Sequence, residues 1–353
     1  MASKAKSPRE RKSPAKGGGR RPFAIDVHTH IRIPELLEFV AGNPIKAKGP
    51  GTEDWFSASS VANLKGQDRD KARLARLTDA KTRLREMNRR GVDIQVVSSN
   101  FPVSCYWMDG PKGLRASRIS NDGVADWVAK SPDRFVGLAS VALQHPKSAA
   151  GELERSVKKL GMRGAWIASN IRAKDLGEDR FRPFWAKAEE LGVPIFVHPL
   201  GTTDIIRLKK YFLFNTIGQP FEETMAMSSL IHEGVMDTYP KLKVVICHGG
   251  GYLPYYAARG DRSFHVRAEV RANIKKPPSA YLRKFYYDSI VFDHKILNNL
   301  ISVSGLGKVM MGTDYPLVRD DGAAFIRSNR ALSKEAKDRI LWKNAAKLMK
   351  IKV

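Results

Sequence analysis

The sequence has few cysteines and no long apolar segment. Cys105 and Cys247 are the only cysteines among 353 residues, which excludes a disulfide framework and favours a reducing compartment. No apolar run approaches the roughly 18 residues needed to span a bilayer, and no apolar signal segment follows the basic N-terminus. We therefore expect a cytoplasmic protein that makes no contact with a membrane.

Acidic residues are scarce relative to basic ones. The chain has 61 Lys and Arg against 36 Asp and Glu, a formal charge of +25. Residues 1–22 hold eight basic residues and one acidic residue, so 25 − 7 leaves +18 for the rest. This segment is too poor in apolar residues to fold, and we predict a disordered basic tail. The remaining charge has no interleaved aromatic residues, which favours a surface for small anionic ligands over a nucleic-acid site.

From Phe23 onward, strand-like and helix-like segments alternate. Helical connections require a parallel sheet, and eight such units are typical of a closed (β/α)8 TIM barrel. We predict this α/β barrel over residues 23–349, with a small insertion after the first strand at about 31–70, where three prolines interrupt any period. The predicted strands are residues 24–30, 92–97, 134–141, 162–168, 193–198, 242–248, 285–289 and 308–313.

The first strand argues against the main structural alternative. An open doubly wound sheet would carry a glycine-rich phosphate-binding turn after its first strand. Here the apolar strand ends in His28-Thr29-His30. Residues two apart in a strand share a face, so both imidazoles can reach one metal ion while Thr29 points away.

Other titratable side chains stand where later predicted strands end. His198, His248 and Asp314 hold such positions, although singly each could be an ordinary strand-end residue or a helix cap. In a barrel the carboxyl ends of all strands face one pocket. His28, His30, His198 and Asp314 could therefore bind one divalent ion. Three imidazoles and a carboxylate suit Zn²⁺ with an open position, and Mn²⁺, Co²⁺ or Fe²⁺ would also accept them.

Seven further motifs accompany these ligands. They are Asn215-Thr216-Ile217-Gly218-Gln219-Pro220, Leu230-Ile231-His232-Glu233-Gly234-Val235, Tyr239-Pro240-Lys241-Leu242-Lys243, Cys247-His248-Gly249-Gly250-Gly251, Pro277-Pro278-Ser279, Tyr287-Asp288-Ser289 and Met311-Gly312-Thr313-Asp314-Tyr315-Pro316. Together with the ligands they resemble the amidohydrolase superfamily, in the branch typified by aminocarboxymuconate semialdehyde decarboxylase. The resemblance covers essentially residues 23–349 and implies a TIM barrel of the metal-dependent hydrolase type.

The resemblance implies a single metal ion. The family's paired histidines fall on His28 and His30, its strand-five ligand on His198 and its strand-eight ligand on Asp314. Relatives with two metals carry a bridging lysine at the end of strand four. Residues 162–168 contain no lysine, so we expect one divalent ion, with Zn²⁺ as the first choice.

The resemblance also implies catalytic and substrate-binding residues. The family's proton-handling histidine falls on His248, with Asp314 as the second catalytic residue. Arg259 matches an arginine that reaches the substrate of a neighbouring subunit, which implies a homodimer. A second substrate arginine belongs in the insertion, where Arg69 and Arg73 are candidates.

Tyr211 is a further candidate for substrate contact. Its ring could line an aromatic-sized pocket, although it could equally pack within a lid. The predicted substrate of the whole site is a small anionic carboxylate.

We predict a metal-dependent non-oxidative decarboxylase of a small aromatic or muconate-like carboxylate, in which metal-bound water and His248 handle the proton. The alternative is a hydrolase of a lactone, amide, ester or C–C bond, or a hydratase, because the same fold and ligands serve these reactions. A minor alternative is a nucleic-acid-binding protein that uses the basic tail and surface.

Overall fold

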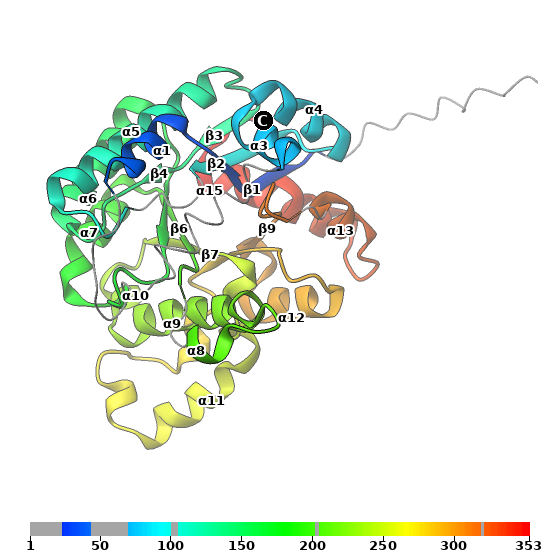
Figure 1. The fold of residues 1–353 in the computed structure, drawn as a ribbon. Helices are drawn as coiled ribbons and strands as arrows, with labels where there is room; N and C mark the ends of the chain where they lie inside the picture. Colours follow the sequence, from blue (N-terminus) through cyan, green and yellow to red (C-terminus); the bar gives the residue numbers. More distant parts are fainter. Residues whose placement is uncertain (1–22, 44–69, 100–104, 202–204, 319–320) are drawn as a thin grey trace, which may run out of the picture.

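The computed structural model describes residues 23–43, 70–99, 105–201, 205–318 and 321–353. Within this part of the chain, strands alternate with helices, and the paired strands run parallel and in chain order (Figure 1). The strands are β1 (Ile25–Ile31), β2 (Ile94–Ser99), β3 (Phe135–Gly137), β4 (Ala139–Ser140), β5 (Ala165–Ala168), β6 (Pro194–His198), β7 (Lys243–Ile246), β8 (Tyr286–Asp288) and β9 (Val309–Met310).

The two sheets join into one closed barrel. β3 pairs with β2 and β4 pairs with β5, so the short strands on either side of Leu138 are two halves of one barrel strand. At the other seam, the Val27 amide donates to the Met311 carbonyl at 2.9 Å, and the His30 amide donates to the Tyr315 carbonyl at 2.8 Å. These bonds connect β1 to the segment after β9. The predicted (β/α)8 barrel is confirmed.

The helices pack outside the strands, and their ends follow local sequence signals. The sequence keeps one helical period over 71–90, but the structure divides this stretch, because the Asp79 side chain accepts from the amides of Lys81 and Thr82 and starts a new helix. The helical stretch that the sequence predicts over 220–237 is likewise divided by Gly234, at φ +70°. The helices are α1 (Pro34–Ala41), α3 (Lys71–Thr78), α4 (Ala80–Arg90), α5 (Gly110–Ala129), α6 (Pro146–Leu160), α7 (Arg182–Leu191), α8 (Ile205–Leu208), α9 (Gln219–His232), α10 (Val235–Thr238), α11 (Leu253–Val266), α12 (His294–Ser304), α13 (Gly322–Ser328), α14 (Lys334–Asp338) and α15 (Asn344–Met349).

Two predicted segments fall largely outside the described residues. The tail over 1–22 lies outside them entirely, as does the stretch 44–69 of the predicted insertion. The described start of that insertion is helical, because α1 begins at Pro34 directly after β1. The tail and the remainder of the insertion therefore stay predictions.

The barrel interior is filled with apolar side chains at the amino-terminal ends of its strands. Ile25, Val96 and Val245 are fully buried there, and Leu348 and Met349 of α15 pack against the same cluster. Fully burying one such aliphatic side chain is worth about 1.5–3 kcal/mol. This cluster gives the opposite, carboxyl end a rigid base. In the described part of the chain, no helix combines the length and apolar character required for crossing a membrane.

β1 contains an irregularity just before the paired histidines. Between Asp26 and Thr29, three steps along β1 oppose two steps along β2, which is the signature of a β-bulge. Val27 belongs to the interior apolar cluster, and the next residue, His28, reaches the polar end of the barrel. Regular alternation would send His28 to the face opposite Val27. The bulge instead lets both side chains point into the barrel.

Candidate metal and catalytic centre

Four side chains from three parts of the chain meet at the carboxyl end of the barrel. The ligand atoms of His28, His30, His198 and Asp314 all lie within 4.8 Å of one another. Asp314 Oδ1 is 2.9 Å from His30 Nε2 and 3.5 Å from His28 Nε2. The structure therefore brings together all four predicted metal ligands, and their spacing could hold a metal ion.

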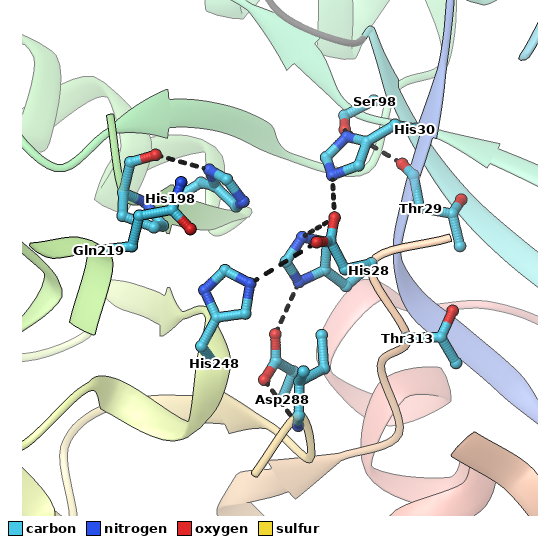
Figure 2. Close-up of polar contacts among 12 residues, drawn as sticks. His28, Thr29, His30, Ser98, His198, Gln219, His248, Asp288 and Thr313 are labelled. Atoms are coloured by element: carbon cyan, nitrogen blue, oxygen red, sulfur yellow. Dashed lines mark hydrogen bonds and ion pairs between the residues drawn. The ribbon is translucent and has the colours of Figure 1, made fainter. Parts of the chain in front are cut away.

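Each imidazole of this cluster is held by a bond from its other nitrogen. His28 Nδ1 lies 2.7 Å from Asp288 Oδ2, and His30 Nδ1 lies 3.0 Å from the Ser98 hydroxyl (Figure 2). His198 Nδ1 lies 2.9 Å from the Pro199 carbonyl oxygen. Because carboxylates and carbonyls only accept, and the Ser98 hydroxyl donates to the Thr29 carbonyl, Nδ1 is the protonated nitrogen in each ring. Every Nε2 keeps a lone pair for a metal ion.

The facing atoms have no hydrogen-bond partner in the described part of the chain. Nε2 of His28, His30 and His198 and Oδ1 of Asp314 are buried and unsatisfied. Buried polar atoms are normally paired, because leaving one unpaired costs roughly 1–3 kcal/mol. One cation coordinated by these atoms would satisfy all four. The residues present therefore fit a divalent metal ion.

The charge states of these groups also suit a cation. Burial lowers the pKa of His30 and His198, which keeps their imidazoles neutral. Burial raises the pKa of Asp314, but the close contact with His30 and the nearby imidazoles of His28 and His248 outweigh it and hold this pKa below its ordinary value. Neutral imidazoles and an ionised carboxylate are the forms that bind metals.

Trp166 of β5 forms one wall of this cluster. Its ring stacks on His198 with centroids 4.3 Å apart and an interplanar angle of 26°. It meets His30 edge-on at 4.7 Å and His28 at 5.5 Å. Trp166 therefore restricts the rotation of three ligand rings, and it occupies the strand on which the sequence offers no lysine.

His248 lies beside the cluster on the turn after β7. Its backbone has φ +47°, and Gly249, Gly250 and Gly251 follow with φ of +64°, +85° and +62°. A side chain at Gly251 would meet the Pro220 carbonyl oxygen at 2.1 Å, so this turn needs glycine for close contact with α9. The turn places His248 Nε2 at 4.0 Å from Asp314 Oδ2.

Glu223 of α9 is the partner of His248. Its Oε1 lies 2.7 Å from His248 Nδ1, and the carboxylate is fully buried. Burial lowers the pKa of His248, but the negative charge and hydrogen bond of Glu223 outweigh it and raise the pKa to about 10. His248 can therefore hold a proton on Nε2, the nitrogen directed away from Glu223.

His248 and Asp314 line a cavity of about 460 Å³. Its other walls are largely aromatic and aliphatic, and include Tyr255, Phe292 and Val318. The Tyr255 hydroxyl is buried and, within the described residues, has no hydrogen-bond partner. Such a cavity suits a small planar molecule that carries a polar group.

The predicted substrate-binding residues either do not line this cavity or lie outside the described residues. Tyr211 is 87% exposed, Arg259 is exposed on α11, and neither lines the cavity. Arg73 is half-buried on α3, and its amide bonds to the Asp70 side chain that caps this helix. Arg69 is not among the described residues. Their roles stay predictions.

The sequence argument missed the residues that hold the ligands. Asp288 ends β8, so its position at a strand end was the available signal. Glu223 lies within α9, and no strand-end pattern could have found it. Ser98 lies one residue beyond the strand predicted over 92–97, and a serine hydroxyl gave no signal for a metal site.

Comparison with known proteins agrees with the fold and the ligand pattern. A model of the amidohydrolase family matches residues 25–351. The chain belongs to the amidohydrolase family. The predicted resemblance to this superfamily is therefore confirmed.

Several of the proteins similar to this chain are decarboxylases. The chain is 32% identical over 337 residues to 2-amino-3-carboxymuconate-6-semialdehyde decarboxylase of Dictyostelium discoideum, covering 93% of this chain and 92% of the relative. It superposes on the crystal structure of 5-carboxyvanillate decarboxylase from Sphingomonas paucimobilis with a TM-score of 0.81 and 27% identity, covering 94% of this chain and 99% of the other.

A second solved structure contains a metal. Dihydroxybenzoic acid decarboxylase from Polaromonas sp. JS666, determined with bound manganese and the inhibitor 2-nitroresorcinol, matches with a TM-score of 0.78 and 26% identity, covering 94% of this chain and 97% of the other. A metal site in this amidohydrolase is therefore supported by its own geometry and by a related structure.

Proposed function

We propose that this amidohydrolase is a metal-dependent decarboxylase that releases CO2, without oxidation, from a small aromatic or muconate-like carboxylate. The observation that carries the proposal is the arrangement of four unsatisfied ligand atoms beside a histidine that can hold a proton, all at one cavity. Relatives that cover nearly the whole chain are decarboxylases of such carboxylates.

One divalent ion would be held by His28, His30, His198 and Asp314. The three nitrogen donors favour Zn²⁺, and Mn²⁺ is the other main candidate because a related decarboxylase binds it. β5 offers Trp166 in place of a lysine, which supports one ion rather than two. When bound, the ion would supply positive charge that polarises the substrate and stabilises negative charge in the transition state.

The residues of the chain account for the remaining steps. The cavity would orient the substrate with its carboxylate-bearing carbon toward His248. His248 Nε2 would deliver a proton to that carbon as its bond to the carboxylate breaks and CO2 leaves with no change in oxidation state. The electron pair of the broken bond forms the new C–H bond, so one carboxylate and one proton give one C–H product and one CO2. Apolar walls around the cavity would exclude competing water.

We propose that the protein works as a homodimer. Exposed apolar side chains gather on 211–225 and at 252–256, including Tyr211, Phe212 and Tyr256 at 87%, 58% and 65% exposure. Large exposed apolar patches mark interaction surfaces. Figure 1 shows α8, α9 and α11 grouped on one side of the barrel, and Arg259 lies on α11. In such a dimer, Arg259 would approach the substrate of the partner subunit.

The proposed function is tested by metal analysis and CO2 detection on the purified protein. We expect one equivalent of Zn or Mn and CO2 release from at least one member of a panel of hydroxybenzoates and carboxymuconates. One equivalent of metal with products that gain water would contradict decarboxylation and favour a hydrolase or hydratase. Absence of bound metal would contradict the ligand set.

A further inference from the structure

Glu223 is a buried carboxylate whose hydrogen-bond partner among the described residues is His248. It lies on α9 with no exposed surface, and its Oε1 contacts His248 Nδ1 at 2.7 Å. Its second oxygen, Oε2, is buried and without a hydrogen-bond partner in the described part of the chain. Burying a carboxylate is costly unless it is paired. The pairing with His248 is therefore the contact that explains a charged group at this position.

The His248 ring needs such a contact to present a defined nitrogen. A histidine ring that turns by 180° about its last side-chain bond exchanges Nδ1 and Nε2 for carbon atoms, and this torsion is broad. His248 also stands on a strained turn before three glycines with positive φ. A fixed acceptor at Nδ1 selects one ring orientation, which leaves Nε2 facing Asp314 and the cavity.

α9 is itself locked to the turn that carries His248. The Thr224 hydroxyl accepts from the Tyr252 amide at 2.8 Å, and Gly251 lies directly against the Pro220 carbonyl. Glu223 stands between these two contacts in sequence. Its carboxylate is therefore held in place relative to the His248 ring and offers Nδ1 an acceptor at a fixed position.

We propose that Glu223 is a positioning residue that fixes the orientation of the His248 ring, so that Nε2 faces the cavity and delivers the proton. This inference rests on the proposed function, because it deepens the role of His248 in decarboxylation. Glu223 does not line the cavity and is not part of the metal-ligand cluster. It should therefore affect turnover without affecting metal content or substrate affinity.

The chain offers a matched control on the same helix. Glu222 is also buried, at 5% exposure, but it accepts from the side-chain amide of Asn170 at 2.9 Å, whereas Glu223 contacts His248. Glu222→Gln keeps an acceptor for Asn170 and makes the same chemical change as Glu223→Gln. A general disturbance of α9 would affect both variants.

The experiment compares Glu223→Gln, Glu223→Ala and Glu222→Gln in the metal-loaded protein. Residues that orient a metal-ligating histidine typically contribute about 10–100-fold to activity, and we expect an effect of the same order for a residue that orients His248. We expect kcat for CO2 release to fall about tenfold in Glu223→Gln, which retains an acceptor oxygen, and about 100-fold in Glu223→Ala. KM and metal content should be unchanged, and Glu222→Gln should resemble the wild type.

A second measurement is independent of turnover. In protein labelled with ¹⁵N-histidine, the signals of His248 are assigned by their loss in His248→Ala. We expect the shift of a carboxylate-bonded Nδ1–H in the wild type and in Glu222→Gln, and its loss in Glu223→Ala. If the wild type releases no CO2 from any substrate, the proposed function fails, while these signals still decide the contact with Glu223.

Three results would overturn the positioning role. The first is wild-type kcat with an unchanged His248 signal in Glu223→Ala. The second is an equal loss of kcat in Glu222→Gln, which would indicate a structural effect of the helix. The third is loss of bound metal in Glu223→Gln, which would place Glu223 in support of the ligand cluster instead.

Discussion

The two ends of the barrel are built from different residues. At the amino-terminal ends of the strands, Ile25, Val96 and Val245 form an apolar cluster covered by Leu348 and Met349 of α15. At the carboxyl ends, β1, β6 and β9 lead into three histidines and a carboxylate whose metal-binding atoms have no hydrogen-bond partner among the described residues. One end of the barrel is thus filled by packed apolar side chains, and the other presents polar atoms that can bind a ligand.

The backbone shows the same division. His248, Phe292 and Asp314, which line the cavity at the carboxyl end, have φ of +47°, +57° and +56°. A left-handed conformation in a residue other than glycine costs of order 1–3 kcal/mol, and persists only where the surrounding structure imposes it. Burial of the apolar cluster at one end therefore offsets the free-energy cost of the strained backbone at the polar end. Four predictions test this division, from the largest expected effect on activity to the smallest.

Removal of the metal should have the largest effect. A chelator should lower CO2 release on the order of 1,000-fold or more, because a metal supplies several kcal/mol of transition-state stabilisation. Activity should return when one equivalent of Zn²⁺ or Mn²⁺ is added, and the melting temperature should rise with it. Full activity in chelated protein with no detectable metal would contradict a functional metal site.

His248→Ala should abolish most turnover and retain the metal. General acid–base groups contribute about 10²–10⁴-fold, and His248 lies outside the ligand cluster. The measurement is kcat for CO2 release with metal analysis of the same sample. His232→Ala is the control, because His232 contacts the Val270 carbonyl and not the cavity. A fully active His248→Ala variant would exclude the proton-delivery role.

Asp288→Asn should weaken metal binding by about 10–100-fold, as for other outer-sphere partners of metal ligands. Asn can still accept from the Gly249 amide, but its amide nitrogen cannot accept from His28 Nδ1. Metal affinity is measured by competition with a chelator. Asp293→Asn, which changes an exposed cap of α12, should bind metal normally. Equal affinities in the two variants would show that His28 does not depend on Asp288.

Leu348→Ala should destabilise the fold and leave the chemistry intact. Removing a buried leucine side chain costs about 2–5 kcal/mol of unfolding free energy, and Leu348 lies at the closed end of the barrel. Denaturant unfolding measures the loss, and kcat per folded molecule should match the wild type. Lys347→Ala, exposed on the same helix, is the control. A large fall in kcat would show that the two ends are not independent.

Much of the fold was predictable because it depends on local patterns. Alternating strands and helices specify a parallel barrel, and the strand ends His198 and Asp314 were recognised from apolar runs that stop at a titratable residue. The helix boundaries at Asp79 and Gly234 were missed, because a capping side chain and a left-handed glycine interrupt an otherwise continuous helical period.

The candidate site was predictable only in part. Its ligand cluster follows from the rule that all strands of a barrel point the same end toward one pocket. The assignments of Arg259 and Tyr211 came from resemblance and pattern, and both side chains are exposed away from the cavity. Contacts across subunits or within the predicted insertion leave no periodic signal in one chain, so these roles stay predictions.

The sequence by itself determined the eight-unit barrel and the identity of the residues that could bind a metal, because both are written in strand periodicity and in residue type. Only the tertiary structure decided which nitrogen of each imidazole is free. That choice depends on Asp288, Ser98 and the Pro199 carbonyl. It also decided that Glu223, remote in sequence and on a helix, faces His248. Hydrogen-bond partners of this kind are set by how helices pack on strands, and no local pattern encodes that packing.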